Sequence, residues 1–501
     1  MIKVAIKSEK LSPFGVPPIL MRTSIGAMRV GRWQFSMVSS QKSMVLQVIL
    51  VSSRLVARLS YRKMVWSQLV NMVNNNVTFV SRSVPFCLFI PQKIIFKGNI
   101  FDILRFFSNF VAVISAWSER MNTNKMNSVT VRKVSDKKDL DAFVQFPLDL
   151  YRGCEQYIPD LNDDVRNSFN PNKNHGLSFT EVQAFIAERD GVVVGRIAGI
   201  INTRANTKWN VKCVRFGYID FIDDMEVSAA LLQTVAEWGK ERGMEVIQGP
   251  LGITDFDKEG MLIEDFDREG SMIEIYNYAY YPEHMKAHGF DKVVDWVQIR
   301  VKVPETVPAR YARVARLSKE MYNLTVKKIS HRDGMGKGGH RLFDLVNQSY
   351  APLFGYSEFS PRQVDFFLKN YVPHCDMNLI PLIENDKGEL VGAAVTMGSL
   401  NKALKKAQGK LLPWGWIHLL KSLYIRNEDT ANLLLVAVRP DMQGLGVNAL
   451  IFDDLIPIYN KKGYKYAETG PQLEDNVKEL SQWKPLNPET IKRRRCFGKS
   501  I

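Results

Sequence analysis

The sequence predicts an α/β (α+β) protein of two successive domains, each a mixed, largely antiparallel sheet flanked by helices. Two observations predict this class. A short apolar run at 433–438 is followed by a glycine-containing bend and a helical pattern from Val447. Earlier, two strand patterns surround an Asp190-Gly191 turn and precede a strand, a helix and a strand. Alternation between strand and helix periods is typical of helices that cover a sheet.

Composition separates the first residues from the rest of the chain. The 501 residues are 46% hydrophobic, enough to bury two or three cores. Residues 1–120 carry 16 Lys and Arg against Glu9, Asp102 and Glu119, whereas the remainder carries 51 basic and 49 acidic side chains. The net charge of +15 is therefore not a basic patch on a folded body, and we predict no nucleic-acid partner.

Residues 1–125 form a basic N-terminal extension without a clear helical or strand period. Their apolar runs at 43–51 and 106–117 are too short to span a bilayer. No secretory signal layout is present in them. Two interpretations stand: a disordered, membrane-touching extension, or residues upstream of a true translation start at Met121 or Met126. The abrupt change to globular composition near Met126 favours the second.

Cysteine and histidine spacings predict no metal site. The five cysteines are scattered without a Cys-x-x-Cys pair, which favours reduced thiols in a cytoplasmic protein. The seven histidines show no metal-ligand spacing.

The first globular half is predicted at 126–305. We expect strands at 129–134, 182–187, 192–201, 216–221 and 244–248, with helices at 136–150 and 226–243. The loop before the second helix contains Asp223 and Asp224 and no glycine. Two carboxylates at a helix N-terminus repel a diphosphate, so we expect no coenzyme site in this half.

The second half is predicted at 306–501. Helices are expected at 340–350 and, opened by Ser360-Pro361, to about 370, before a hairpin of 377–384 with 389–398. Strands are expected at 465–468 and 491–499. The arginines of the last strand are expected to face phosphate, and a nuclear signal is the rival interpretation of them. Segment 401–424 joins lysines to an apolar stretch with Trp414 and Trp416. It is typical of a surface on anionic lipid, and a buried connection is an equal alternative.

The bend Gln443-Gly444-Leu445-Gly446 is the most informative motif. A helix that starts after it presents unpaired N–H groups, which bind anions, and glycine allows a phosphate to come close. The bend lacks the Lys-Ser/Thr of a nucleotide triphosphate loop and the third glycine of a dinucleotide loop. An ordinary glycine turn is the alternative.

The motif resembles the acetyl-CoA pyrophosphate loop of the GNAT acyltransferase superfamily, Gln/Arg-x-x-Gly-x-Gly/Ala. Gln443 and Gly446 match, whereas Asn448 stands where Gly or Ala is usual. Other motifs resemble a bacterial tandem-GNAT family that includes bacterial ceramide synthase-type acyltransferases. They are Gly249-Pro250, 260–267, Tyr276-Asn277 with Tyr280-Tyr281, Gly289-Phe290 and the string that ends at Asn476.

The resemblance implies two tandem GNAT domains, the first degenerate and the second an acyl-CoA site. The implied activity is transfer of an acyl group from acyl-CoA or acetyl-CoA to a primary amine, including a long-chain, sphingoid-type amine. The alternatives are acetylation of a small soluble amine or a protein, and a non-catalytic GNAT-fold binding protein. Peripheral contact with the inner face of the membrane through 401–424 is also expected.

The resemblance also assigns residues to roles. The coenzyme-binding residues are Val436, Val438, Gln443, Gly444, Gly446, Val447, Asn448 and Asn476. The substrate-binding residues are Tyr276, Asn277, Tyr280, Tyr281, Trp414 and Trp416. Glu468 is the candidate general base, with a solvated strand-end carboxylate as the alternative, and Tyr464 or Tyr466 is the candidate proton donor to the leaving thiolate. The tyrosine cluster is equally explained as core.

Overall fold

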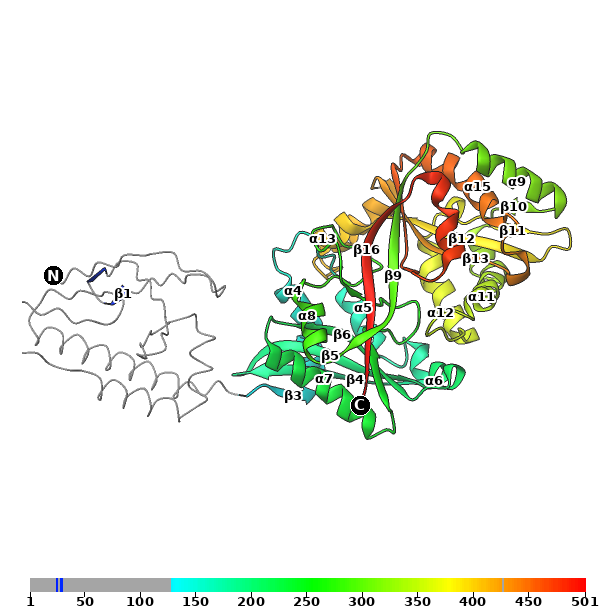
Figure 1. The fold of residues 1–501 in the computed structure, drawn as a ribbon. Helices are drawn as coiled ribbons and strands as arrows, with labels where there is room; N and C mark the ends of the chain where they lie inside the picture. The colour runs from blue at the N-terminus through cyan, green and yellow to red at the C-terminus, as the bar shows by residue number, and fades with distance from the viewer. Residues whose placement is uncertain (1–23, 26–27, 30–127, 426–427) are drawn as a thin grey trace, which may run out of the picture. The chain divides into compact units, whose positions relative to one another are not determined.

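The computed structural model describes residues 24–25, 28–29, 128–425 and 428–501 (Figure 1). The chain divides into two compact units, Met1–Met126 and Asn127–Ile501. In the first unit the structure describes β1 (Ser24–Ile25) paired antiparallel with β2 (Met28–Arg29). The expectations for the rest of residues 1–125 lie outside the described residues.

The first half of the second unit follows the predicted element order. Its strands are β3 (Thr130–Lys133), β4 (Thr180–Arg189), β5 (Val192–Asn202), β6 (Cys213–Phe221), β7 (Val246–Gly249), β8 (Met261–Leu262) and β9 (Asp291–Lys302). Its helices are α4 (Lys137–Leu150), α5 (Asn162–Ser168), α6 (Thr203–Trp209), α7 (Met225–Lys240) and α8 (Tyr280–Ala287). Asp190 and Gly191 turn between β4 and β5 with φ of 54° and 76°, the left-handed conformation of a two-residue hairpin turn.

The second half contains the remaining elements. Its strands are β10 (Thr325–Lys327), β11 (Leu382–Glu384), β12 (Leu390–Gly398), β13 (Thr430–Val438), β14 (Tyr466–Thr469), β15 (Gln472–Leu473) and β16 (Glu489–Ser500). Its helices are α9 (Ala309–Met321), α10 (His331–Gly334), α11 (Lys337–Tyr350), α12 (Pro361–Tyr371), α13 (Asn401–Ala407), α14 (Gly415–Leu420), α15 (Val447–Lys462) and α16 (Val477–Gln482).

Local hydrogen bonds explain the start of α12 and the late start of β11. Ser360 caps α12 in a reciprocal capping box with Gln363. The strand predicted at 377–384 is wrong over its first residues, which form a 3₁₀ turn (Met377–Leu379), and β11 begins only at Leu382. The Asp376 side chain accepts the amide of Asn378 and so favours the turn over a sheet ladder.

A single 14-stranded sheet joins the two halves. Its main order is β10-β11-β12-β13-β14-β9-β16-β7-β6-β5-β4-β3. The long strands β9 and β16 lie side by side at the centre of the molecule (Figure 1). Strand β9, from the first half, also pairs with β14, and β16, from the end of the chain, also pairs with β7. The last strand of the chain therefore completes the sheet of the first half.

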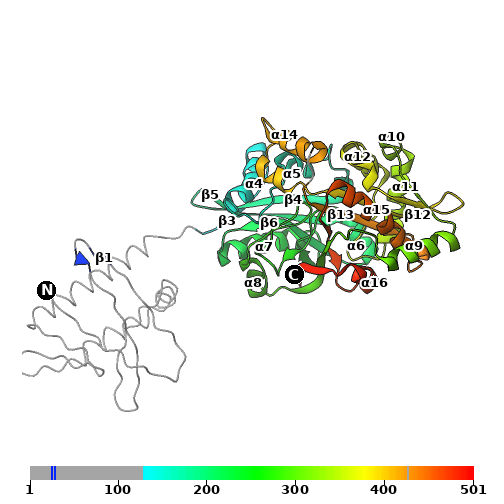
Figure 2. The same ribbon diagram turned by 90° about the horizontal axis from the view of Figure 1, so that it is seen from above.

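Helices cover both faces of the second half's sheet. Helices α9 and α15 pack on one face, around Ile299, Val391, Leu433, Ile451 and Leu455. Helix α11 packs on the opposite face, around Leu345, Val346, Ala393 and Ala437. In the view from above, α15 and α9 lie in front of β13 and β12, with α11 and α12 behind them (Figure 2). The predicted fold class, a mixed sheet flanked by helices, is confirmed.

Candidate functional site at the separation of β13 and β14

Strands β13 and β14 separate in the middle of the sheet. They pair in parallel from Thr430↔Tyr466 to Leu433↔Thr469, and the amide of Gly470 then donates to the carbonyl of Leu433 at 3.0 Å. Beyond this point β13 continues to Val438 and pairs with β12 alone among the described strands. Residues 434–436 are half-buried here, since β14 no longer pairs with them.

The ladder with β12 fixes where the free backbone of β13 points. The amide of Arg439 donates to the carbonyl of Val391 at 2.9 Å, and in an antiparallel ladder successive residues face opposite sides. Val436 and Val438 therefore turn their amides and carbonyls into the gap that β14 leaves.

The end of α11 occupies part of this gap. The Tyr350 hydroxyl donates to the carbonyl of Val436 at 3.1 Å, and the Ser349 hydroxyl donates to the carbonyl of Val438 at 3.0 Å. These bonds use carbonyls only. The amides of Val436 and Val438 stay directed into the gap as donors for a carbonyl group of a ligand.

The glycine bend lies at the end of the same strand. Gly446 has φ of +85° and forms the N-cap of α15 without a side-chain cap, so the amides of Val447 and Asn448 point out of the helix. A Cβ at Gly446 would lie 2.2 Å from Ser318 Oγ of α9, and Ser318 in turn donates to the carbonyl of Leu445 at 2.6 Å. Only glycine fits at this position. Asn448 Oδ1 accepts the amide of Ala449 at 3.1 Å, whereas Gly446 supplies no side-chain cap for the amides of Val447 and Asn448.

Helix α16 forms the far wall of the gap. The Asn448 side chain donates to Gln482 Oε1 at 2.7 Å, and Asn476 caps α16 by accepting the amide of Glu479 at 3.3 Å. Within the described residues, the buried Nε2 of Gln482 has no hydrogen-bond partner. Burial raises the pKa of Glu479 to about 7.

Four residues around the gap were not predicted from the sequence: Ser349, Tyr350, Glu479 and Gln482. The first two end a helix whose last residue stands 80 positions before the start of β13, and no spacing relates them to the glycine bend. A signal for α16 was present, because Asn476 precedes Glu479 at capping distance. Only the fold brings these residues to one place.

The catalytic candidates lie in two places: Tyr466 and Glu468 share one face of β14, whereas Tyr464 precedes the strand. Glu468 lies opposite Arg300 of β9, whose Nη1 is 3.0 Å from its carboxylate, and burial raises the pKa of Glu468. The Arg300 guanidinium also lies 4.0 Å from the ring centroid of Tyr466. Tyr464 instead packs in the core under α15, beside Tyr459, where burial raises its pKa to about 12. The structure thus brings Glu468 and Tyr466 together and leaves Tyr464 apart.

The corresponding gap of the first half is filled by its own side chains. Strands β6 and β7 pair in parallel only to Arg215↔Gln248. The Tyr281 hydroxyl accepts the amide of Phe221 at the end of β6 at 3.1 Å, and the Tyr280 hydroxyl donates to the carbonyl of Phe221. These hydroxyls satisfy the backbone groups that a bound coenzyme would otherwise engage.

The helix terminus of the first half is also closed. Asp224 caps α7 by accepting the amides of Glu226 at 2.9 Å and Val227 at 3.3 Å. Arg189 holds the same carboxylate at 2.7 Å. Of the two carboxylates that predicted the loss of a coenzyme site, Asp224 therefore occupies the terminus, whereas Asp223 contacts His284 Nε2 at 3.0 Å.

The residues predicted to bind substrate do not meet at one place. Asn277 accepts the amide of Leu262 at 2.7 Å and donates to its carbonyl at 3.0 Å, and the Tyr276 hydroxyl donates to the carbonyl of Phe266 at 3.1 Å. With Tyr280 and Tyr281 they lie inside the first half. Trp414 and Trp416 are 68% and 44% exposed, on α14 and the residue before it. Their roles stay predictions.

The arginines of the last strand do not face phosphate, so that expectation is wrong. Arg495 binds the Asp295 carboxylate through two bonds of 2.7 and 2.9 Å, and Arg494 binds Glu274 at 2.7 Å. Arg493 contacts Glu474 at 2.9 Å. Asp295 comes from β9, Glu274 from the loop between β8 and α8, and Glu474 from the position after β15, so the sequence of the last strand contains none of these carboxylates.

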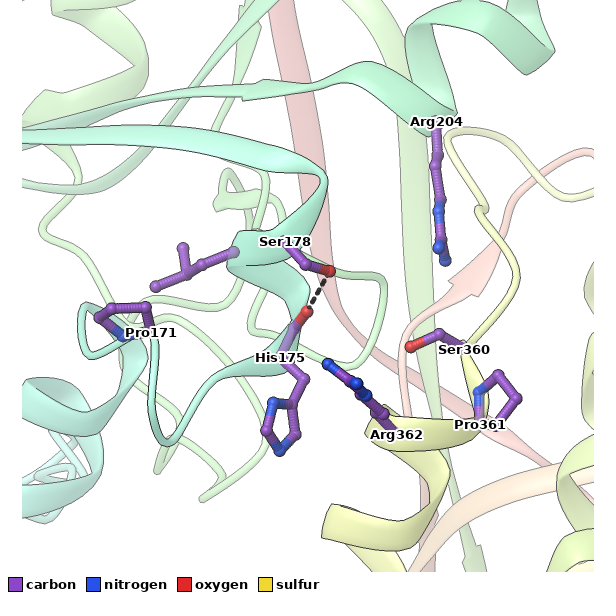
Figure 3. Close-up of a pocket in the computed structure, with 8 residues that line it drawn as sticks. Pro171, His175, Ser178, Arg204, Ser360, Pro361 and Arg362 are labelled. Carbon is purple, nitrogen blue, oxygen red and sulfur yellow. Dashed lines mark hydrogen bonds between the residues drawn. The ribbon is translucent and has the colours of Figure 1, made fainter.

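A separate pocket of about 530 Å³ lies between the loop before β4 and the start of α12 (Figure 3). His175, Arg204 and Arg362 turn their side chains toward it. None of the predicted site residues lines it.

No group of three or more His, Cys, Asp or Glu residues in 128–425 and 428–501 is arranged to hold a metal ion. No helix in the described part of the chain is both long and apolar enough to cross a membrane.

Comparison with known proteins gives two relatives and a set of similar structures, while no family model matches. The chain is 28% identical over 381 residues to Protein YghO of Escherichia coli (strain K12), covering 74% of this chain and 95% of that protein. It is 24% identical over 317 residues to Bacterial ceramide synthase of Caulobacter vibrioides, covering 63% and 82%. Among solved structures, a tandem GNAT protein from the clavulanic acid biosynthesis pathway matches with TM-score 0.43 and 12% identity over 74% of this chain and 98% of that one.

One of these relatives is named a ceramide synthase, which is an acyltransferase. This similarity agrees with the resemblance to bacterial ceramide synthase-type acyltransferases that the motifs indicate.

Proposed function

We propose that the protein is an N-acyltransferase that moves an acyl group from coenzyme A to a primary amine. The observation that carries the proposal is the continuity of the gap beside β13 with the uncapped N-terminus of α15. Amides of Val436 and Val438 precede the Gly446 bend on one strand, so a single extended ligand meets amide donors along its length and a helix terminus at its diphosphate.

Glu468 is the proposed general base. An alkylamine has a pKa near 10.4, so removing its proton at neutral pH costs about 4–5 kcal/mol. Glu468 lies on β14, one residue pair before the strands separate at the gap. Burial raises the pKa of Glu468, which makes the carboxylate a better proton acceptor. Arg300 fixes the orientation of the carboxylate at 3.0 Å.

The remaining groups account for the bonds that change. The amine nitrogen forms a bond to the thioester carbonyl carbon, the carbon–sulfur bond breaks, and Glu468 takes the proton of the amine. Amides of Val436 and Val438 donate to the carbonyl oxygen as negative charge develops on it. Tyr466, on the same face as Glu468, is the proposed source of the proton for the leaving thiolate.

We further propose a lipid amine as the acceptor. The segment that follows α13 and includes α14 exposes large apolar side chains, including Leu412, Trp414, Trp416 and Tyr424. Exposed lysines precede this apolar stretch at Lys402, Lys406 and Lys410, and Lys421 lies within it. Apolar and basic side chains together favour contact with an anionic bilayer. The name of the ceramide synthase relative supports the same class of acceptor.

Isothermal titration with acetyl-CoA and palmitoyl-CoA tests the proposal. We expect binding of one coenzyme per chain, with the long-chain thioester binding more tightly. Tighter binding of acetyl-CoA supports the alternative, acetylation of a soluble amine or a protein. If neither thioester gives heat on titration, both proposed transferase activities are contradicted and a non-catalytic GNAT-fold protein is supported.

A further inference from the structure

The pocket of about 530 Å³ lies at the boundary between the two halves of the second unit (Figure 3). The 3₁₀ turn η1 (His175–Ser178) and the start of α6 line it from the first half, and the start of α12 lines it from the second. Arg204, Arg362 and His175 turn their side chains toward the cavity. None of the described residues that line it is Asp or Glu. A cavity with such a lining has a positive potential, which attracts anions.

Arg362, at the start of α12, has a charge that the protein leaves unpaired. No described residue forms a hydrogen bond or an ion pair with its side chain, which is exposed. Asp365 is the acidic residue of the same helix, and its carboxylate lies 3.1 Å from His340 Nε2 instead. The Arg362 guanidinium is therefore available to a ligand in the pocket.

Arg204 reaches the pocket from α6 of the first half. Its guanidinium lies 4.0 Å from the ring centroid of Phe179, and its Nη1 donates a long hydrogen bond of 3.4 Å to the carbonyl of Glu358. The Glu358 carboxylate is bound to Lys208 at 2.8 Å, and this contact holds the pKa of Glu358 below its usual value. The contacts of Arg204 thus orient its planar group without pairing its charge with a carboxylate.

His175 supplies a third polar side chain. Its ring lies edge-on to that of Phe366, with 5.8 Å between the ring centroids. The turn that carries it is fixed, since the Ser178 hydroxyl donates to the carbonyl of His175 at 2.8 Å and Asn174 accepts the amide of Gly176. Among the residues that the structure describes, none forms a hydrogen bond with the imidazole nitrogens. The imidazole is therefore positioned at the pocket and still able to bind.

Side chains, and not the start of α12, provide the donors of this pocket. Ser360 Oγ accepts the amide of Gln363 at 3.4 Å, and Gln363 Oε1 accepts the amide of Ser360 at 2.9 Å. Pro361 has no amide hydrogen. The helix start is thus capped by its own residues, and a ligand in the pocket meets two guanidinium groups and an imidazole.

This set of donors matches the oxygens of a phosphate monoester. Each guanidinium presents a planar fork of N–H groups that binds two phosphate oxygens. The two forks and the imidazole come from three elements, so they suit oxygens that point in different directions. A carboxylate has two oxygens in one plane, whereas a phosphate monoester has three and carries about −1.5 to −2 charges at pH 7. Pro171, Leu177 and Pro361 add apolar surface for the organic part of the ester.

We propose that this pocket binds a phosphate monoester and that the bound ester links the two halves. The proposal does not depend on acyl transfer, because none of the residues assigned to the coenzyme or to the amine lines the pocket. Arg204 and Arg362 belong to different halves, so a phosphate held by both adds a contact to their boundary. Arg215 of the first half already donates to the carbonyl of Gly355 there at 2.9 Å. Binding should therefore stabilise the folded protein.

Titration calorimetry and thermal denaturation with glycerol 3-phosphate test the proposal. We expect about 10 mM ester to raise Tm by about 2 °C or more beyond the effect of sodium chloride at equal ionic strength, because the ester binds the folded state. Arg362→Gln and Arg204→Gln should each weaken binding by about tenfold or more, since each removes a charge-assisted fork. Arg362→Lys keeps the charge without the fork and should bind with intermediate affinity.

Arg332→Gln is the matched control. Arg332 lies on α10, is exposed and does not line the pocket, so its replacement changes the net charge equally and should keep the affinity of the wild-type protein. Without ester, Arg362→Gln should have the Tm of the wild-type protein, because exposed side chains without partners contribute little to stability. A loss of ester affinity in Arg362→Gln at constant Tm therefore reports binding and not damage to the fold.

The source of the phosphate is identified with vesicles. Phosphatidylcholine vesicles with and without phosphatidic acid present the same monoester on a lipid. Dependence on Arg362 for glycerol 3-phosphate indicates a soluble ester, and dependence for the phosphatidic acid vesicles alone indicates a lipid headgroup. Equal binding by Arg362→Gln and Arg332→Gln for both forms of the ester overturns the proposal.

The coenzyme site is kept apart by a second pair of variants, because coenzyme A itself carries phosphate. Palmitoyl-CoA should bind Arg362→Gln with the Kd of the wild-type protein, and glycerol 3-phosphate should bind Gly446→Ala as it binds the wild-type protein. An ester effect that is lost in Gly446→Ala and kept in Arg362→Gln places the ester at the helix α15 terminus and overturns the proposal. Failure of palmitoyl-CoA to bind contradicts the proposed transferase and leaves the ester site to its own test.

Discussion

Asn432 and Glu468 lie directly opposite each other on β13 and β14, one residue pair before the two strands separate. The amides of Val436 and Val438 point into the gap beyond this pair. The Glu468 carboxylate, the proposed general base, therefore lies at the edge of the gap.

The glycine bend offers a matched pair of substitutions. Gly444→Ala and Gly446→Ala both place a side chain at positive φ, which costs about 1–2 kcal/mol of stability. A Cβ at Gly444 meets no atom within 4 Å, whereas one at Gly446 meets Ser318. We expect Gly446→Ala to weaken palmitoyl-CoA binding by about tenfold or more, because the helix start must shift and the amides with it. Titration calorimetry measures the Kd for palmitoyl-CoA. An equal loss of affinity in Gly444→Ala and Gly446→Ala contradicts the prediction.

Replacing Glu468 by Gln should slow acyl transfer and spare binding. General bases contribute about 10²- to 10⁴-fold to rates, so we expect kcat to fall within that range while the Kd for palmitoyl-CoA stays constant. Glu479→Gln is the control, since Glu479 is a second buried carboxyl beside the gap. Single-turnover kinetics measures both. A larger fall of kcat in Glu479→Gln than in Glu468→Gln would identify Glu479 as the general base.

The first half should bind no coenzyme. Tyr281→Phe removes a hydroxyl that contacts Tyr151 at 3.0 Å and accepts the Phe221 amide, so it should cost about 1–3 kcal/mol of unfolding free energy. The stoichiometry of palmitoyl-CoA should be one per chain in both proteins. Calorimetry measures the stoichiometry and urea denaturation the stability. Two coenzymes per wild-type chain would contradict the filled gap.

Stability should fall as pH rises because of Glu259. Burial, followed by the Asp255 carboxylate, raises the pKa of Glu259 from 4.5 to about 8. The folded protein therefore holds this proton more tightly than the unfolded chain does, and its contribution is present below pH 4.5 and is lost between pH 4.5 and 8. Urea denaturation at pH 5 and pH 8.5 should show a smaller loss in Glu259→Gln than in the wild-type protein. Equal losses contradict the assignment.

The exposed surface of α14 should bind anionic vesicles. Trp414→Ser with Trp416→Ser should reduce sedimentation with phosphatidylglycerol vesicles and leave Tm within about 2 °C, because exposed side chains contribute little to stability. Met321→Ser on α9 is the control, since Met321 is 67% exposed and Trp414 is 68% exposed. Equal sedimentation of all three proteins contradicts a membrane contact at this surface.

Elements that depend on local pattern and turn chemistry could be predicted from the sequence. The Asp190-Gly191 turn, the Ser360 cap and the 433–450 strand, bend and helix were all predicted from neighbouring residues. The acidic loop at Asp223-Asp224 likewise predicted a helix terminus unsuited to phosphate. These features follow from short-range sterics and hydrogen bonding, which the chain carries wherever it folds.

Only the tertiary structure decided which distant groups meet. Glu274 and Lys492 stand 218 positions apart in the chain and come together because β16 returns to pair with β9. The pairing of Arg495 with Asp295 was also hidden, since a charge shows no partner until a neighbouring strand supplies one. Strand pairing is set by the burial of whole faces of the sheet, and no spacing within a single segment encodes it.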